Sequence, residues 1–318
     1  MKILVIGKLS GGIGTHVSFL KKYSKNDIRT FTYGSDGDYS APIINFPVLR
    51  ALTFLLIGFP YGLYCIKKEK PDIIHSHFIL PAGLLGFILA KLTGRKFYLT
   101  VHGSDIKKAN ILKPLKKWIC RNANVIAVSK YLSKELKEWN VKAKVIPNGV
   151  DLYEIKKAKK IKIRKPAALF VGSLVPEKVD FLPEIISPNQ NFYIIGDGKL
   201  SKSLDGIKLG QLPQSKVYQY MKSADCLIST SKWEGFGLTI LEAMACGLPV
   251  IVRPNTASKE LANGRGLFAD SPQEFTSQIE KLLKDSKLKN QFIKRGREYA
   301  RKFDWRETAR LTDNFYKL

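Results

Sequence analysis

Short apolar runs alternate with amphipathic segments along the first half of the chain. The amphipathic segments at 15–23, 81–92 and 131–139 repeat apolar residues at helical spacing. Continuous apolar runs, typical of buried strands, occur at 2–6, 28–33, 72–77, 96–101, 124–128 and 143–147. Strands of this kind that alternate with helices predict a parallel sheet covered on both faces.

The alternation resumes after Asn148-Gly149 and a basic stretch, KKAKKIKIRK, at 156–165. Further apolar runs predict strands at 168–172, 191–196, 226–230 and 249–252, and helical spacing recurs at 176–186, 217–224 and 238–245. We interpret 1–155 as an N-terminal domain, 156–165 as a linker and 166–303 as a second domain. The predicted fold class is therefore α/β, with two doubly wound, Rossmann-like domains. Ligands of such domains bind beyond the carboxyl ends of the strands, so the crevice between the two domains is the expected site.

Charge is the unusual bulk property of this 318-residue chain. Lys and Arg number 53 against 27 acids, a net charge of +26. Residues 1–155 hold 24 basic and 10 acidic side chains, a net of +14, and the basic stretch adds +7. Such a field favours anionic partners, namely phosphates, nucleic acid or an anionic membrane, although general surface solvation is the alternative. No aromatic residues are interspersed in the basic stretch, which disfavours single-stranded nucleic acid as the partner.

Cysteine usage and hydropathy indicate a cytoplasmic location. The four cysteines are far apart and include no C-x-x-C pair, which fits a reducing compartment. The N-terminal apolar run is too short for a signal peptide. The longest uncharged apolar run, 51–66, is shorter than the roughly 20 residues that a spanning helix needs, and Pro60 interrupts it. This run therefore predicts a packed helix or one that lies on a membrane surface.

A glycine-rich loop, GKLSGGIG at 7–14, joins the first predicted strand to the first helix. Glycines such as Gly11 and Gly12 let backbone N–H groups approach a phosphate at a helix N-terminus. The G-x-G-x-x-G spacing of dinucleotide-binding proteins is absent, and no acid ends the second strand. The loop is interpreted as a ligand loop, with a tight structural turn as the alternative.

The four histidines, His16, His75, His77 and His102, all lie in the first domain. Three of them follow or end predicted strands, where doubly wound folds place their sites. Structural and functional roles are both open for them. Without a carboxylate at ligand spacing, a metal site is disfavoured.

The most specific constellation lies in the second domain, where KWEGFGL (232–238) joins a strand to an apolar helix. Glu242 lies on that helix among Leu, Ala and Met, where a carboxylate is costly unless it has a partner or a ligand. Glu234 precedes it by eight residues, at the glycine turn. Two acids in this arrangement are suited to binding hydroxyl groups, and the turn's N–H groups and helix dipole suit a diphosphate. The alternative is that Glu242 is exposed at the rim of the helix.

The chain resembles family 4 of the retaining, nucleotide-sugar-dependent glycosyltransferases over nearly its whole length. The segment WEGFGLTILEAMACGLPVIV (233–252) resembles the family's E-x7-E signature, with Glu234 and Glu242 as its two acids. VIPNGVD (145–151) and ALFVGSLVPEK (168–178) resemble the hinge-proximal motif and the opening strand of the second domain. The resemblance implies the GT-B fold, with two domains facing a central cleft and a last helix, 304–318, that packs back on the first domain.

The resemblance also implies roles for individual residues. Glu242 would hold the ribose hydroxyls of the donor, Glu234 would contact hydroxyls of the transferred sugar, and His102 would lie beside that sugar, so that His102 and Glu234 are the catalytic candidates. The remaining donor-binding candidates are Lys178 and the backbone of Gly235, Phe236, Gly237 and Leu238 for the diphosphate, with Gly11 and Gly12 closing over the donor. Neither a metal nor a cofactor beyond the nucleotide sugar is implied, since cations and helix N-termini would stabilise the leaving diphosphate.

Two departures from the family pattern concern the leaving-group side. Ser173 stands where the family usually has Arg, so one of two phosphate cations is missing, and Arg253 or Lys232 are candidates to compensate. The tetrapeptide 255–258, NTAS, replaces a glycine pair of the family. A weak or altered enzyme is the alternative.

The sequence thus predicts a retaining glycosyltransferase that uses a nucleotide-diphosphate-sugar donor. The alternatives are a sugar-nucleotide epimerase or another enzyme of the same fold, and a basic nucleic-acid-binding protein. The acceptor is a sugar, lipid or glycan. Because the first domain usually holds the acceptor in this family, its charge and the 51–66 run predict reversible contact with anionic membranes and a lipid-linked or membrane-proximal acceptor. The base, the sugar and the acceptor cannot be inferred from the sequence.

Overall fold

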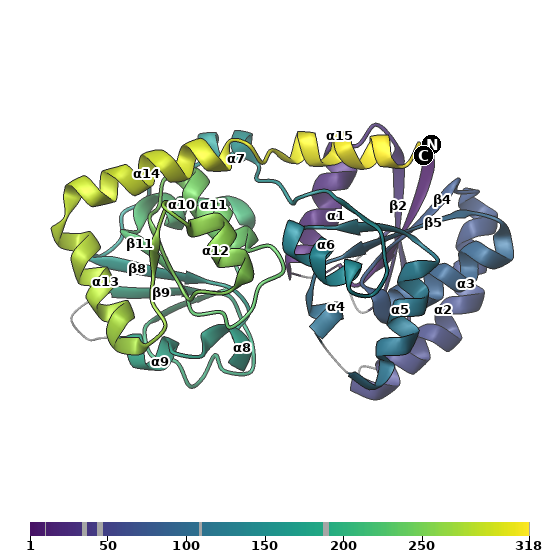
Figure 1. The fold of residues 1–318 in the computed structure, drawn as a ribbon, viewed down its shortest axis with the longest axis horizontal. Helices are drawn as coiled ribbons and strands as arrows, with labels where there is room; N and C mark the ends of the chain where they lie inside the picture. The colour runs from purple at the N-terminus through teal and green to yellow at the C-terminus, as the bar shows by residue number, and fades with distance from the viewer. Residues whose placement is uncertain (10, 34–36, 43–46, 108–109, 187–190, 318) are drawn as a thin grey trace. The chain divides into compact units, whose positions relative to one another are not determined.

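A computed structural model describes residues 1–9, 11–33, 37–42, 47–107, 110–186 and 191–317. The chain divides into two compact units (Figure 1). Unit 1 comprises Met1–Asn148 and Trp305–Leu318, and unit 2 comprises Gly149–Asp304.

Unit 1 is built on a seven-stranded, fully parallel sheet of order β3-β2-β1-β4-β5-β6-β7. Its strands are β1 (Lys2–Gly7), β2 (Asp27–Tyr33), β3 (Tyr39–Ala41), β4 (Ile73–His77), β5 (Lys96–Val101), β6 (Asn124–Ala127) and β7 (Ala143–Val145). Its helices are α1 (Gly11–Tyr23), α2 (Pro47–Glu69), α3 (Leu84–Thr93), α4 (Ser104–Lys107), α5 (Lys113–Arg121), α6 (Lys130–Lys137) and α15 (Trp305–Phe315), with short π and 3-10 turns at Ile79–Gly83 and Asn110–Leu112. The strand order reverses between β1 and β4, so ligand loops are expected beyond the carboxyl ends of these two strands.

Helix α2 contains the apolar run 51–66, and the proline in this run predicts an interruption at Pro60. The helix instead continues through Pro60. The carbonyl that the proline leaves without a donor belongs to Leu56, whose side chain is exposed. A carbonyl on the solvent side of a helix can tilt toward water, which makes the missing hydrogen bond tolerable.

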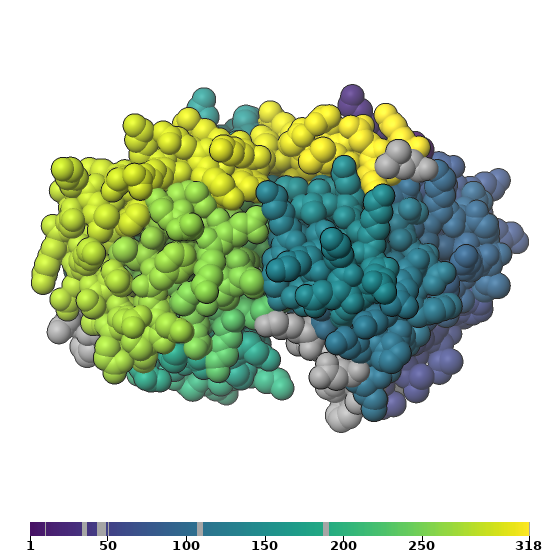
Figure 2. Space-filling model, viewed as in Figure 1, coloured from purple at the N-terminus to yellow at the C-terminus, as the bar shows by residue number. Residues whose placement is uncertain are grey.

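Helix α15 packs within unit 1, on the α1 side of the sheet, and its yellow atoms lie on the surface of that unit in Figure 2. Trp305 is fully buried, and its ring stacks on Phe19 at 5.1 Å. The carboxylate of Asp313 accepts hydrogen bonds from Ser24 and Asn26. The last helix therefore contributes apolar and polar contacts to the core of the unit that contains the N-terminus.

Unit 2 is built on a six-stranded parallel sheet of order β10-β9-β8-β11-β12-β13. Its strands are β8 (Ala167–Val171), β9 (Asn191–Ile195), β10 (Ile207–Gly210), β11 (Cys226–Ser229), β12 (Val250–Val252) and β13 (Leu267–Phe268). Its helices are α7 (Leu152–Lys157), α8 (Pro176–Val179), α9 (Leu182–Ile185), α10 (Gln214–Ser223), α11 (Leu238–Cys246), α12 (Thr256–Ala262), α13 (Pro272–Lys284) and α14 (Ser286–Ala300). The helix predicted at 176–186 is two short helices, since Pro183 is tolerated in a first turn and not in a helix interior.

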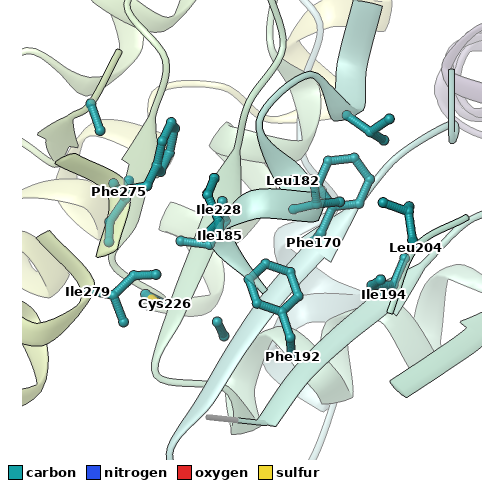
Figure 3. Close-up of a cluster of buried hydrophobic side chains, with 14 of the residues drawn as sticks. Phe170, Leu182, Ile185, Phe192, Ile194, Leu204, Cys226, Ile228, Phe275 and Ile279 are labelled. Atoms are coloured by element: carbon teal, nitrogen blue, oxygen red, sulfur yellow. The ribbon is translucent and has the colours of Figure 1, made fainter. Parts of the chain in front are cut away.

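The core of unit 2 lies between one face of this sheet and the helices that cover it. Phe170 and Phe192 come from adjacent strands, and Phe275 and Ile279 come from α13 (Figure 3). All four side chains are almost completely buried. Because this core holds the sheet rigid, the loops that follow β8 and β11 start from fixed positions.

The basic stretch 156–165 belongs to unit 2, and the division of the chain falls before Gly149. The boundary at 155 and the linker predicted from charge differ from this arrangement. The backbone N–H of Ile161 donates to Ser223, and that of Arg164 donates to Tyr193. These contacts attach the stretch to unit 2, and the lack of acids within it reflects a solvated surface of that unit.

Candidate active site

The loop after β11 turns sharply into helix α11. Gly237 caps this helix in the left-handed region, with φ of 83°, which a side chain would strain. The first backbone N–H groups of α11 have no acceptor within the helix and form a centre of partial positive charge. Gly235, Phe236, Gly237 and Leu238 form the turn into this helix end, and their binding of a diphosphate stays a prediction. The ring of Phe236 is buried against Phe303, so this residue contributes packing through its side chain.

Glu242 lies on α11, and its side chain is buried, with 5% of the residue exposed. Its Oε1 accepts hydrogen bonds from Gln214 Nε2 at 2.8 Å and from Tyr218 OH at 3.2 Å. Burial raises the pKa of Glu242 to about 8, against the hydrogen bond from Tyr218, which lowers it. The alternative of an exposed rim carboxylate is wrong. The partners on α10 are neutral, so the carboxyl group retains capacity for further hydrogen bonds.

Lys178 on helix α8 and Glu234 in the loop after β11 come together. Lys178 Nζ lies 3.1 Å from Glu234 Oε1, which also accepts a hydrogen bond from Ser231. The hydroxyl of Thr230 donates to the carbonyl oxygen of Lys178, which ties α8 to the end of β11. Strands β8 and β11 are adjacent at the point where the strand order reverses, and this adjacency brings the two predicted residues into one site.

Lys232 and Arg253, the two candidates to replace the arginine that the family has in place of Ser173, both form ion pairs with Asp180. Lys232 Nζ lies 2.9 Å from one oxygen of Asp180, and Arg253 Nη1 lies 2.5 Å from the other. Arg253 also pairs with Asp270 at 2.8 Å. Burial alone would raise the pKa of Asp180, but hydrogen bonds from Lys232 and Arg253 bring it below its ordinary value. The charges of both cations are therefore balanced within unit 2, and Asp180 is a residue that sequence reasoning missed.

Backbone contacts hold the loop after β8, which leads to Lys178, against the loop after β9. Gly196 has φ of +136°, and a Cβ atom there would lie 1.8 Å from the carbonyl oxygen of Gly172. The N–H of Leu174 donates to the carbonyl of Asp197 at 2.9 Å. Only glycine fits at 196. The absence of a side chain there lets the loop after β9 lie directly against the backbone of the loop after β8.

The tetrapeptide that departs from the family pattern forms the cap of α12. Asn255 accepts a hydrogen bond from the Ser258 N–H, and the Ser258 hydroxyl accepts one from the Asn255 N–H. Asn255 Nδ2 also donates to the carbonyl oxygen of Ser231. This substitution for the glycine pair therefore serves a structural purpose, because it fixes the start of α12 against the β11 loop.

In unit 1, the four histidines cluster around the carboxyl end of β4. His75 and His77 lie on β4, His102 follows β5, and His16 lies on α1. The ring of His16 lies 5.1 Å from that of His77 and 5.2 Å from that of His102. The ring of His75 lies 4.6 Å from that of His77. The described residues contain no group of three or more potential ligands arranged to hold a metal ion.

Each histidine has a defined neighbour. His16 Nδ1 lies 2.7 Å from Asn148 Oδ1, and because that oxygen only accepts, Nδ1 donates. His75 hydrogen-bonds with Tyr316 and Thr100. Burial lowers the pKa of His16 to about 4 and that of His75 to about 3, and repulsion from His16 once it is protonated in acid contributes to the lower pKa of His75. These rings are therefore neutral near pH 7.

Gly11 and Gly12 begin helix α1 in unit 1. Gly11 has φ of +59°, which explains a glycine there, whereas a Cβ on Gly12 would meet no atom within 4 Å. Gly14, by contrast, would place a Cβ 2.8 Å from the Leu9 carbonyl oxygen. The lack of a side chain at Gly12 is thus not required by packing inside unit 1, and it leaves the backbone open to a ligand.

Comparison with known proteins identifies the class. Residues 10–154 match the family model described as Glycosyltransferase Family 4, and residues 153–299 match that of glycosyl transferases group 1. An uncharacterised glycosyltransferase of Methanocaldococcus jannaschii is 33% identical over an alignment of 327 positions, and the alignment covers 93% of this chain and 91% of the relative. The chain belongs to glycosyltransferase family 4.

Other similar proteins support the same class and fold. A galactosyltransferase of Escherichia coli that uses UDP-Gal and an α-D-GlcNAc-diphosphoundecaprenol acceptor is 31% identical, with 59% of each chain covered. Sucrose-phosphate synthase of Thermosynechococcus elongatus has a TM-score of 0.81 at 19% identity, with 100% of this chain and 98% of that chain covered. A glycosyltransferase involved in lipopolysaccharide biosynthesis has a TM-score of 0.75 at 14% identity, with 99% of both chains covered. The protein is a glycosyltransferase with the GT-B fold.

Proposed function

We propose that this glycosyltransferase moves a sugar from a nucleoside diphosphate sugar to its acceptor with retention of the anomeric configuration. The observation that carries the donor class is Glu242, a buried carboxyl group on α11, held by Gln214 and Tyr218. The expectation of retention rests on the family to which the chain belongs. A buried carboxyl with two neutral donors on one oxygen keeps acceptor capacity for the paired hydroxyls of a ribose. Proton NMR of the first-formed product, compared with the donor, reads the anomeric outcome directly.

The donor's other groups match the residues around Glu242. Lys178 and the free N–H groups at the start of α11 supply positive charge for the diphosphate, and Glu234 supplies a carboxylate for hydroxyls of the sugar. In the free protein Lys178 is paired with Glu234 at 3.1 Å, so a bound diphosphate competes for this lysine. The roles of Gly11, Gly12 and His102 toward the donor stay predictions that the family resemblance carries.

The reaction needs charge stabilisation on the leaving diphosphate as the bond to the sugar breaks. Preorganised N–H groups and a cation act on developing charge without reorganisation. We expect Lys178 and the α11 N-terminus to meet this need without a metal ion. Transfer that continues at an unchanged rate in excess EDTA supports this expectation, and a loss that Mg²⁺ restores contradicts it.

The test of the nucleotide site is Glu242→Ala. A thermal-shift panel of nucleotides first identifies the base, since a ligand at 100 times its Kd stabilises by about 2.7 kcal/mol. Isothermal titration with that nucleoside diphosphate then compares the wild type with Glu242→Ala and with Glu280→Ala, whose carboxylate is exposed on α13. Binding should be lost in the first variant and kept in the second. Unchanged affinity in Glu242→Ala would remove this residue from the site.

We also propose that the acceptor is lipid-linked or membrane-proximal and that unit 1 contacts anionic membranes. Helix α2 exposes an apolar stripe, namely Leu49, Leu52, Leu56, Ile57 and Tyr64, which ends at Lys67 and Lys68. Helix α5 lies on the same face of the sheet as α2 and α3 (Figure 1). Half-exposed Trp118 on α5 lines a pocket together with Lys113, Lys117 and Arg121. Apolar residues flanked by cations suit the interface of an anionic bilayer. None of the helices in the described ranges is long and apolar enough to cross a membrane.

Vesicle flotation tests the membrane contact. The wild type should float with vesicles that contain phosphatidylglycerol and not with pure phosphatidylcholine, and salt should weaken the binding. Leu56→Ser and Trp118→Ser remove exposed apolar anchors and should reduce flotation, whereas Leu283→Ser, at an exposed leucine of α13, should not. Absence of flotation with anionic vesicles at low salt would contradict the proposal and favour a soluble acceptor.

A further inference from the structure

His77 is a buried histidine to which neither the sequence motifs nor the proposed donor site assigns a role. It ends strand β4, beside the segment that follows β5, and its Nδ1 lies 2.9 Å from Nε2 of His102. The other ring nitrogen of His77, Nε2, is buried and has no hydrogen-bond partner among the described residues. The ring is therefore anchored at one nitrogen, and the neighbour at that nitrogen is the histidine expected beside the transferred sugar.

The hydrogen bond between the two rings defines which nitrogen carries each proton. Burial holds the pKa of both histidines well below its ordinary value, so both rings are neutral and each carries one N–H. If His102 donated, His77 would have to carry its own proton on Nε2, as a buried N–H without an acceptor. Buried N–H groups without a partner are rarer in proteins than buried acceptors without one. The favoured arrangement is that His77 donates from Nδ1 and His102 accepts at Nε2.

The proton of His102 is then on its Nδ1. The part of the chain that the structure describes provides no hydrogen-bond partner for that nitrogen, and His102 as a residue is partly exposed. His16 packs edge-on against the same ring at 5.2 Å, which restricts its rotation. His102 thus presents one neutral, oriented N–H donor.

We propose that His77 is a positioning residue that holds His102 in the Nδ1–H form, so that His102 donates a hydrogen bond to an oxygen of the sugar bound for transfer. The inference rests on the proposed function for the identity of that ligand. The donation between the two rings is a property of the free protein. In this arrangement His102 orients the sugar and does not accept a proton at Nδ1.

NMR of the ¹⁵N-histidine-labelled full chain tests the donation directly. Two-bond ¹H–¹⁵N correlations distinguish protonated from bare ring nitrogens, and His102→Gln assigns the His102 signals by their loss. The wild type should show a protonated Nδ1 and a bare Nε2 on His102 near neutral pH. A protonated Nε2 on His102 in the wild type would overturn the proposal without any variant of His77.

Two substitutions of His77 separate its positioning role from its bulk. In His77→Asn, the side-chain amide N–H can take the place of Nδ1–H, so His102 should keep its protonated Nδ1. In His77→Leu, the donor is gone, and the preference for a protonated Nδ1 should be lost. An unchanged His102 spectrum in His77→Leu would contradict the proposal.

Ligand affinity connects this hydrogen-bonding state to the sugar. With UDP and UDP-galactose as probes, His77→Leu should weaken UDP-galactose by about tenfold and leave UDP unchanged, and His77→Asn should resemble the wild type. Equal weakening of both probes in His77→Leu would indicate a merely structural role. If neither these probes nor any other nucleoside diphosphate sugar of the thermal-shift panel binds the wild type, the proposed donor class fails, and the NMR measurement still decides the role of His77.

Discussion

Replacing Glu242 by Gln should remove most of the pH dependence of stability that this buried carboxyl gives to unit 2. Gln keeps an oxygen that accepts hydrogen bonds from Gln214 and Tyr218, so the contacts at that oxygen are conserved. What changes is the ability to ionise. The substitution therefore isolates the cost of a buried carboxylate from the cost of a lost contact.

The magnitude follows from the pKa of Glu242. Burial raises this pKa from the ordinary value of 4.5 to about 8. Between these values the unfolded chain has released its proton and the folded chain retains it, so the free energy of unfolding falls as pH rises. The loss is about 1.4 kcal/mol per pH unit, or about 4 kcal/mol between about pH 5 and about pH 8. Below pH 4.5 both states hold the proton, and the contribution to stability is fully present.

Hydrogen exchange of the α11 amides measures the opening free energy of unit 2 in the full chain. Because wild type and Glu242→Gln are compared at the same pH, intrinsic exchange rates and the titration of other groups cancel in the difference. The opening free energy of Glu242→Gln, relative to that of the wild type, should rise steadily with pH. The opening free energy of the control Glu280→Gln should keep a constant difference from the wild type. A difference between wild type and Glu242→Gln that stays constant from about pH 5 to about pH 8 would refute the reasoning.

Three further changes test other parts of the molecule. Ser173→Arg restores the family's second cation and should tighten binding of a nucleoside diphosphate several-fold by titration calorimetry; no gain would show that the loop already suffices. Gly196→Ala places a Cβ 1.8 Å from a backbone oxygen and should destabilise unit 2 by more than about 2 kcal/mol in urea, whereas Gly210→Ala, with φ of +65° and open space, should cost less. In unit 1, burial lowers the pKa of His75 from 6.5 to about 3. Between these values the unfolded chain binds a proton that the folded chain does not, so the free energy of unfolding of unit 1 should fall as pH falls from 6.5 toward 3. Exchange protection of the α1 amides that is equal in acid and at neutral pH would contradict this last expectation.

Local pattern was sufficient to predict the two α/β units and the glycine turn before α11. Buried parallel strands have continuous runs of apolar residues, and amphipathic helices have apolar residues at a 3.6-residue period. Both patterns can therefore be recognised within a short window of sequence. Glu242 was recognisable for the same reason, because it is the one acid among apolar neighbours on its helix. The boundary at 155 was not predictable in this way, since charge marks a solvated surface and does not show to which unit a segment attaches.

The partners of the site residues were decided by the tertiary structure alone. Gln214 and Tyr218 reach Glu242 from a helix more than twenty positions earlier in the chain, and Asp180 neutralises Arg253 across 73 positions. The four histidines meet because β4 and β5 are neighbours in the sheet and α1 returns to the same edge. Strand order determines such encounters, and it depends on the packing of the whole sheet rather than on any local period of the sequence. The same packing removes water from Glu242 and the histidines, and that burial sets the protonation states on which their chemistry depends.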